Sequence, residues 1–197
     1  MQEFDPRQMP VNEVYKLMVG AVVPRPVAWI TTRSASGVVN AAPFSAYTIL
    51  SQDPALILFQ AGGGLREKDT VANVRATSEF VVNVATVPLI DQMHACSANL
   101  PPNVGEPEHF GITLAPSQRV QVPRIAASPI ALECRVFQMF DIGNEPHTVV
   151  IGEVVLFRIA DEVLHDGKID PLRLQPVARI GGPYYAPLGD LIFRPAG

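Results

Sequence analysis

The stretch PRPVAWITTRSASGVVNAAPFSAYTILSQDPALILFQ (residues 24–60) decides the fold. Residues 27–32 are rich in the β-branched and aromatic side chains typical of strands, and SASG (residues 34–37) has turn chemistry. Residues 40–51 interleave polar and small apolar side chains, and residues 55–60 have the pattern of a strand buried on both faces. The stretch predicts a mostly apolar sheet carrying a short polar segment, which suits a flat ligand with one apolar and one polar edge.

Composition favours one folded, mainly β domain. A chain of 197 residues can bury a substantial core, and 48% hydrophobic with 17% charged residues excludes a disordered protein. The 19 prolines break long helices. A net charge of −4 and a pI near 5.5 argue against a protein that binds nucleic acid or acidic membranes.

The ends and the cysteines indicate a cytoplasmic protein without a metal. We expect residues 1–20 to form an arm with a short helix, leaving residues 1–197 as one domain. The polar N-terminus predicts no signal peptide, and the apolar run 17–23 is too short to span a bilayer. Cys96 and Cys134 lie far apart in unlike contexts, so we expect neither a metal site nor a disulfide.

The remaining chain predicts further short elements and one long loop. We expect helices over residues 70–77 and 88–95, and strands over residues 79–84, 112–122, 130–140 and 148–159. The proline-rich loop at residues 97–110 is long for a compact domain. It is therefore a lid, a binding loop or a dimer contact.

The loop around Arg66, Lys68, Asp69 and Thr70 has the strongest chemistry for binding an anion. A helix that begins at Thr70 would offer free backbone N–H groups and the positive end of its dipole. Two cationic side chains and a hydroxyl beside them suit a phosphate monoester. The alternative is an ordinary capped helix with solvated charges, in which Asp69 caps the helix amides.

A second candidate site is the polar set Ser45, Tyr47, Thr48 and Ser51. Prolines on both sides limit the regular strand, so backbone groups here could bond a ligand edge instead of a neighbouring strand. The alternative is that these are outward residues of a half-exposed strand. His147, at the start of another strand, could act at a proton or hydride site or be structural.

Several motifs together resemble the flavin reductase-like family of FMN-binding split barrels. They begin with PRPVAWITT (residues 24–32), GVVNAAPFS (37–45) and SQDPALILF (51–59). They continue with KDTVANVRATSEFVVNV (68–84), SPIALECRV (128–136), VIGEV (150–154) and PVARIGGPYY (176–185). The resemblance covers nearly the whole chain.

The resemblance implies an antiparallel Greek-key split barrel with a few short flanking helices, and a homodimer that binds FMN near the subunit interface. It places Ser45, Ala46, Tyr47 and Thr48 beside the isoalloxazine ring. The other implied site residues are Ser51, Arg66, Lys68, Asp69 and Thr70 on the ribityl-phosphate side, Arg25, Arg179 and Tyr184 as further flavin contacts, and His147 as a catalytic candidate near the flavin and nicotinamide.

Two functions follow from the resemblance, and a third comes from another class. The first is an NADH- or NADPH-dependent flavin oxidoreductase, with a flavin-dependent monooxygenase or an electron-transfer protein as partner. The second is an FMN-binding electron carrier without its own nicotinamide activity. The third is an interaction module that has lost its ligand, which the intact anion loop argues against. No G-x-G-x-x-G strand–helix motif is present, although this family binds nicotinamide without one.

Overall fold

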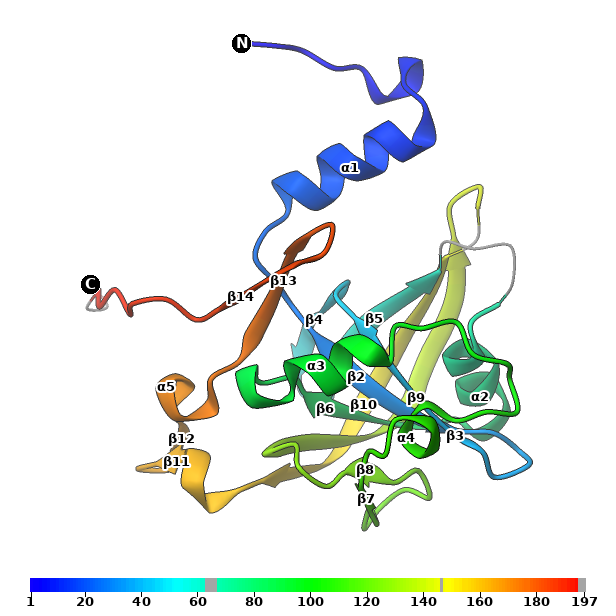
Figure 1. Cartoon of the computed structure of the whole chain (residues 1–197), viewed down its shortest axis with the longest axis vertical. Coiled ribbons are helices and arrows are strands. Elements are labelled where there is room, and N and C mark those ends of the chain that lie inside the picture. Colours follow the sequence, from blue (N-terminus) through cyan, green and yellow to red (C-terminus); the bar gives the residue numbers. More distant parts are fainter. Residues whose placement is uncertain (63–66, 146, 195–197) are drawn as a thin grey trace.

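The computed structural model describes residues 1–62, 67–145 and 147–194. Its centre is a seven-stranded antiparallel sheet (Figure 1). Across the sheet the strands are β3 (Val39–Phe44), β2 (Ala28–Arg33), β6 (Glu79–Val84), β9 (Ile130–Ile142), β10 (His147–Ile159), β5 (Ala55–Gly62) and β4 (Tyr47–Gln52). Hairpins join β2 to β3, β4 to β5 and β9 to β10, while β6 returns to lie between β2 and β9. This mixture of near and distant neighbours is a Greek-key arrangement.

Shorter elements surround the sheet. The helices are α1 (Val11–Ala21), α2 (Asp69–Thr77), α3 (Ile90–Ala95), α4 (Glu106–His109) and α5 (Pro171–Leu174), with 3-10 turns η1 (Pro6–Gln8), η2 (Val87–Leu89) and η3 (Asp161–Val163). A second sheet has the order β1 (Arg25–Pro26), β13 (Val177–Gly181) and β14 (Tyr184–Pro187). Two small hairpins pair β7 (Leu114–Ala115) with β8 (Arg124–Ile125) and β11 (Leu164–His165) with β12 (Lys168–Ile169).

The main core lies on one side of the sheet and is packed around aromatic rings. Phe59 on β5 and Phe80 on β6 meet edge to face, with ring centroids 5.3 Å apart. Gly152 on β10 faces the same ring, because a Cβ atom there would lie 2.3 Å from Cζ of Phe80. A separate core surrounds the buried Trp29 and Met93, so the alternating side chains of β2 serve two cores.

The N-terminal helix α1 extends away from the sheet and lies beside the β13–β14 hairpin (Figure 1). None of its residues is buried, so it adds little to the core. It confirms the short helix expected near the N-terminus. Among the residues that the structure describes, no helix is both long enough and apolar enough to cross a membrane.

The structure confirms a mainly β fold and corrects two expected elements. The strand expected over residues 112–122 is wrong, because only the two-residue strand β7 forms within this range, and its partner β8 lies just beyond it. The backbone amides of Gln118 and Arg119 donate to the carboxylate of Glu133 instead of to a neighbouring strand. The loop over residues 97–110 is also less irregular than expected, since it contains α4.

Candidate functional site

A cavity of about 630 Å³ lies between β3, the start of α2 and the segment that leads into α4. We call it the Lys68 cavity. Its size lies in the range of small-molecule and cofactor sites. It is lined by Asn40, Ala42, Pro43, Phe44, Lys68, Asp69, Thr70, Cys96, Ser97, Ala98, Asn99, Leu100 and Glu106.

The start of α2 forms one wall of the Lys68 cavity. The helix begins at Asp69 and Lys68 is its N-cap, so the expectation of a helix start at Thr70 with Asp69 as cap is wrong by one residue. The side chain of Lys68 makes no capping bond, and the amides of Val71 and Ala72 donate to its carbonyl oxygen, so the positive end of the helix at Asp69 and Thr70 faces the cavity. The structure thus brings Lys68, Asp69 and Thr70 together, while Arg66 lies outside the described residues.

Buried polar side chains hold α2 against the sheet. The hydroxyl of Thr70 donates to Oδ1 of Asn40 over 2.9 Å, so it is engaged within the protein. Thr32 donates to the same oxygen over 3.3 Å, and Asn73 on α2 donates to the hydroxyl of Thr32 over 3.1 Å. These bonds fix the helix start relative to β2 and β3.

Glu106 is a buried carboxylate in the wall of the Lys68 cavity that sequence analysis missed. Its Oε2 accepts from Nδ2 of Asn40 over 2.7 Å and from the backbone amide of Ala41 over 2.9 Å. Burial raises its pKa, and the charge of Asp69 adds to the increase, while the hydrogen bonds oppose it. Glu106 therefore ties the long loop to β3 and Asn40, and through Asn40 to α2.

Close backbone packing keeps Glu106 in place. At the preceding Gly105, a Cβ atom would lie 2.2 Å from the carbonyl oxygen of Val39. Only glycine allows the loop to approach β3 this closely. The position of the carboxylate thus depends on a glycine that sequence analysis treated only as part of a long, proline-rich loop.

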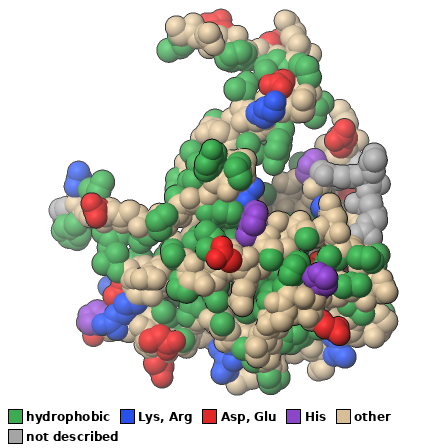
Figure 2. All heavy atoms as spheres, viewed as in Figure 1, with side chains coloured by type: hydrophobic (Ala, Val, Ile, Leu, Met, Phe, Trp, Pro, Cys, Tyr) green, Lys and Arg blue, Asp and Glu red, His purple; other side chains and the backbone are tan. Residues whose placement is uncertain are grey.

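A second cavity, of about 270 Å³, adjoins the first, because Pro43 and Ser97 line both. We call it the Tyr185 cavity. Figure 2 shows the surface hollowed below the N-terminal helix, with cationic and histidine side chains near the hollow. The remaining residues that line the Tyr185 cavity are Tyr15, Val19, Arg25, Val27, Ser45, Arg179, Gly181, Gly182 and Tyr185.

Two arginines give the Tyr185 cavity a positive wall. Arg25 donates through Nη1 to the carbonyl oxygens of Val19 and Val22, through Nη2 to that of Ile180 over 3.2 Å, and through Nε to Ser45 Oγ over 3.4 Å. These contacts join the end of α1 to β13. Neither Arg25 nor Arg179 forms an ion pair with a carboxylate in the described part of the chain.

Tyr185, and not the expected Tyr184, lines the cavity. Tyr185 pairs with Arg179 across β13 and β14, and the Arg179 guanidinium stacks on its ring at 4.5 Å. The phenol oxygen is also 3.1 Å from Nδ1 of His94. Tyr184 is exposed and lines neither cavity, so the register of the hairpin selects its neighbour.

The polar set expected beside the ring is only partly gathered at these cavities. Ser45 lines the Tyr185 cavity, and the carbonyl oxygen of Ala46 accepts from the amide of Gln60 over 2.8 Å. On β4, Tyr47 packs against the main core, and burial raises its pKa to about 12. Thr48 is exposed, and neither Thr48 nor Ser51 lines these two cavities.

Two further candidate groups have defined surroundings. His147 begins β10, where its Nδ1 lies 2.8 Å from the carbonyl oxygen of Glu145 and its ring packs against Gly62, outside both cavities. Cys96 lines the Lys68 cavity, but burial raises the pKa of its thiol to about 12. A neutral thiol is a poor nucleophile, so Cys96 has a packing role.

Comparisons with known proteins agree with this architecture. The sequence model of a family described as "Flavin reductase like domain" matches residues 19–174. The chain is similar to nitrilotriacetate monooxygenase component B from Bacillus cereus, with 32% identity, a TM-score of 0.95 and 98% of each chain covered. It is also similar to 2-nitrobenzoate 2-nitroreductase NbaA from Pseudomonas fluorescens, with 29% identity, a TM-score of 0.91, and coverage of 100% of this chain and 96% of that one.

A further solved structure confirms the fold. A protein with a split barrel domain from Shewanella frigidimarina has 20% sequence identity to this chain and a TM-score of 0.86, with 100% of both chains covered. The expected antiparallel split barrel with a few short helices is therefore the fold of this chain.

Proposed function

Because the chain belongs to the flavin reductase-like family, we propose that it is an FMN-binding oxidoreductase that takes electrons from NADH or NADPH. The observation that carries this proposal is the pair of adjoining cavities. One has a helix start and a lysine, and the other has two arginines and an aromatic wall.

The residues of the Lys68 cavity fit the phosphate of FMN. Lys68 supplies a positive charge, and the start of α2 presents the positive end of its dipole, with no capping bond from the Lys68 side chain. Thr70 acts indirectly, since its hydroxyl is bonded to Asn40 and holds the helix start in place. Arg66, from outside the described residues, is a further proposed phosphate ligand.

The ring of FMN would lie toward the Tyr185 cavity. Ser45 and Pro43 line this side, and we propose that backbone groups of residues 46–48 contact the polar edge of the ring. When bound, FMN supplies the hydride and electron chemistry. The protein orients it, limits access of water and presents a positive surface at Arg25 and Arg179 to an anionic dinucleotide. His147 remains a proposed contributor near the nicotinamide.

A second copy of this chain is the proposed structural partner. Large apolar side chains are exposed on β4 and β9, namely Ile49, Leu50, Phe137, Phe140 and Ile142. We propose that these exposed side chains belong to the contact between the two copies. A homodimer would cover them, and light scattering coupled to size-exclusion chromatography tests this directly. We further propose a partner oxygenase or electron-transfer protein, since one similar protein is a monooxygenase component.

Absorption spectroscopy tests the proposed activity. The purified protein, supplied with FMN and freed of excess ligand, is expected to show flavin bands that bleach anaerobically on addition of NADH or NADPH. Retention of FMN without bleaching by either nucleotide, combined with reduction by a separate reductase, would instead establish an electron carrier. Failure to retain or reduce any flavin would refute the proposal.

A further inference from the structure

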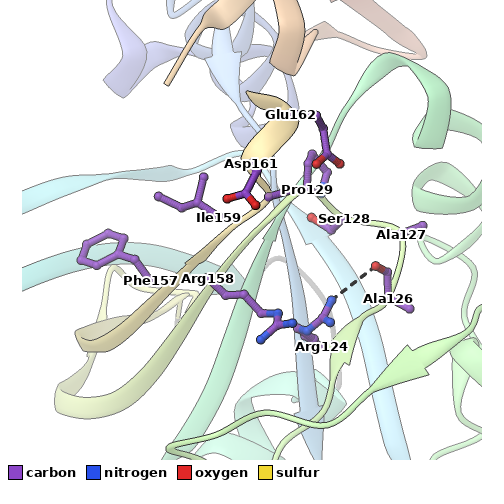
Figure 3. Close-up of a pocket in the computed structure, with 11 residues that line it drawn as sticks. Arg124, Ala126, Ala127, Ser128, Pro129, Phe157, Arg158, Ile159, Asp161 and Glu162 are labelled. Atoms are coloured by element: carbon purple, nitrogen blue, oxygen red, sulfur yellow. Dashed lines mark hydrogen bonds between the residues drawn. The ribbon is translucent and has the colours of Figure 1, made fainter. Parts of the chain in front are cut away.

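A third cavity shares no lining residue with the two already described. It has a volume of about 500 Å³ and lies where β8, the end of β10 and η3 meet (Figure 3). We call it the Arg158 cavity. Its charged side chains are Arg124, Arg158, Asp161 and Glu162. No step of the proposed flavin chemistry uses this cavity.

Two guanidinium groups lie together in the Arg158 cavity. Figure 3 shows the side chains of Arg124 and Arg158 converging, one from β8 and the other from β10. Burial lowers the pKa of Arg124, and the positive charge of Arg158 lowers it further. Two neighbouring positive charges repel each other, so a negatively charged group between or beside them would stabilise the arrangement.

Among the described residues, no carboxylate forms an ion pair with either Arg124 or Arg158. The charge of Glu133 acts on Arg124, but this fully buried carboxylate already accepts from the amides of Gln118 and Arg119. The exposed side chain of Arg158 forms neither a hydrogen bond nor an ion pair with any residue that the structure describes, while its backbone pairs with Ala131 in the sheet.

Arg124 has unused donor capacity as well. Its Nη1 donates only to the carbonyl oxygens of Ile125, over 3.5 Å, and Ala126, over 3.3 Å, the latter drawn in Figure 3. Its Nε is buried without an acceptor among the described residues. A guanidinium has five N–H donors, and most of those on Arg124 and Arg158 therefore lack an acceptor among the described residues.

The opposite charge lies on another part of the same cavity. Asp161 and Glu162 come from η3, and neither forms an ion pair with Arg124 or Arg158 in the described structure. An inorganic anion such as phosphate would meet the arginines but would be repelled by the two carboxylates. A molecule with a carboxylate at one end and an ammonium group at the other would match both sets of charges.

We propose that the Arg158 cavity binds a small organic zwitterion of amino-acid type. Its carboxylate contacts Arg124 and Arg158, for which the planar guanidinium is well suited, and its ammonium group faces Asp161 and Glu162. This site would act independently of the flavin, as a place for a substrate group or a small effector.

Titration with simple ω-amino acids tests the proposal. The probes are glycine, 4-aminobutyrate and 6-aminohexanoate, compared with acetate, ethylammonium and inorganic phosphate. Binding is followed through the Nε–Hε signals of the arginines by NMR. At least one amino acid is expected to bind about tenfold more tightly than acetate or phosphate. Equal or tighter binding of phosphate, or no amino acid better than acetate, would overturn the proposal.

Substitutions test separately the residues proposed to bind the carboxylate and those proposed to bind the ammonium group. Arg158→Gln should weaken amino-acid binding at least tenfold, and Asp161→Asn with Glu162→Gln should remove the advantage over acetate while leaving acetate binding in place. Arg173→Gln, which changes an exposed arginine paired with Asp170 outside the cavity, is the matched control. An equal loss in Arg173→Gln would refute the site. FMN binding, measured in parallel, should not change in any of these variants.

Discussion

Replacement of Glu106 tests how the long loop is held on the sheet. Its Oε2 accepts two hydrogen bonds, from Asn40 and from the amide of Ala41, in a buried setting. Glu106→Ala leaves both donors without an acceptor, at about 1–3 kcal/mol for each. We therefore expect a loss of about 2–6 kcal/mol in the free energy of unfolding, a large share of the roughly 5–15 kcal/mol typical of a domain.

Glu106→Gln should behave differently, because its amide oxygen can accept both bonds. Urea denaturation, followed by the fluorescence of the single tryptophan Trp29, gives the free energy of unfolding of each variant. Glu108→Ala is the matched control, since this exposed glutamate lies on the same helix and should change stability by less than about 0.5 kcal/mol. A Glu106→Ala variant as stable as the control would refute the role of the carboxylate.

The pH dependence gives a second check on Glu106. Its folded-state pKa is raised above the ordinary value of 4.5, so folding favours the protonated form. Relative to Glu106→Gln, the wild type should therefore be most stable below pH 4.5 and lose stability as the pH rises through the raised pKa. If the stability of the wild type relative to Glu106→Gln stays constant or increases with pH, burial does not disfavour the charged carboxylate.

Three further predictions concern the phosphate, the core and the thiols. Lys68→Ala should weaken FMN binding by about 10- to 100-fold through the loss of one charge-assisted bond, while riboflavin binding, measured by the same fluorescence titration, changes little. Equal losses for the two ligands would contradict the phosphate assignment, and Lys168→Ala, at an exposed lysine, is the control. Gly152→Ala should destabilise the fold by about 1–3 kcal/mol in urea, because its Cβ would meet Phe80, and an unchanged midpoint would argue against this packing. Burial raises the pKa of Cys96 and Cys134, so both should resist a thiol reagent at pH 8 until denaturant is added, and rapid labelling of the native protein would contradict their burial.

The sequence predicts the sheet well where local pattern decides the structure. Residues 79–84, 130–140 and 148–159 carry uninterrupted strand patterns and form β6, β9 and β10. The sequence also predicts that Lys68 lies next to a helix start, because helix ends have local signals, and the structure places it at a cavity. The strand predicted over residues 112–122 does not form, because a distant residue decides the structure there. The carboxylate of Glu133 accepts hydrogen bonds from backbone amides that a strand would have used.

The cavity-lining residues that the sequence did not predict depend on contacts between distant residues. Glu106 reaches Asn40 across 66 positions of the chain, and no local pattern marks that pairing. Tyr185 is chosen over Tyr184 by the register of β13 and β14, which a one-residue slip would reverse. The adjoining cavities likewise arise only when β3, α2 and the C-terminal hairpin come together.

The contact between Glu106 and β3 has a consequence for the solubility of the protein. β3 is an outer strand of the sheet, and the amide of Ala41 that points away from β2 is bonded by Glu106. The outer strand of a sheet is a template on which another chain can add a strand and start aggregation. Because Gly105 and Glu106 cover β3, shortening this loop should make the protein aggregate even where the remaining sheet still folds. The loop therefore shields a sheet edge as well as forming a wall of the cavity.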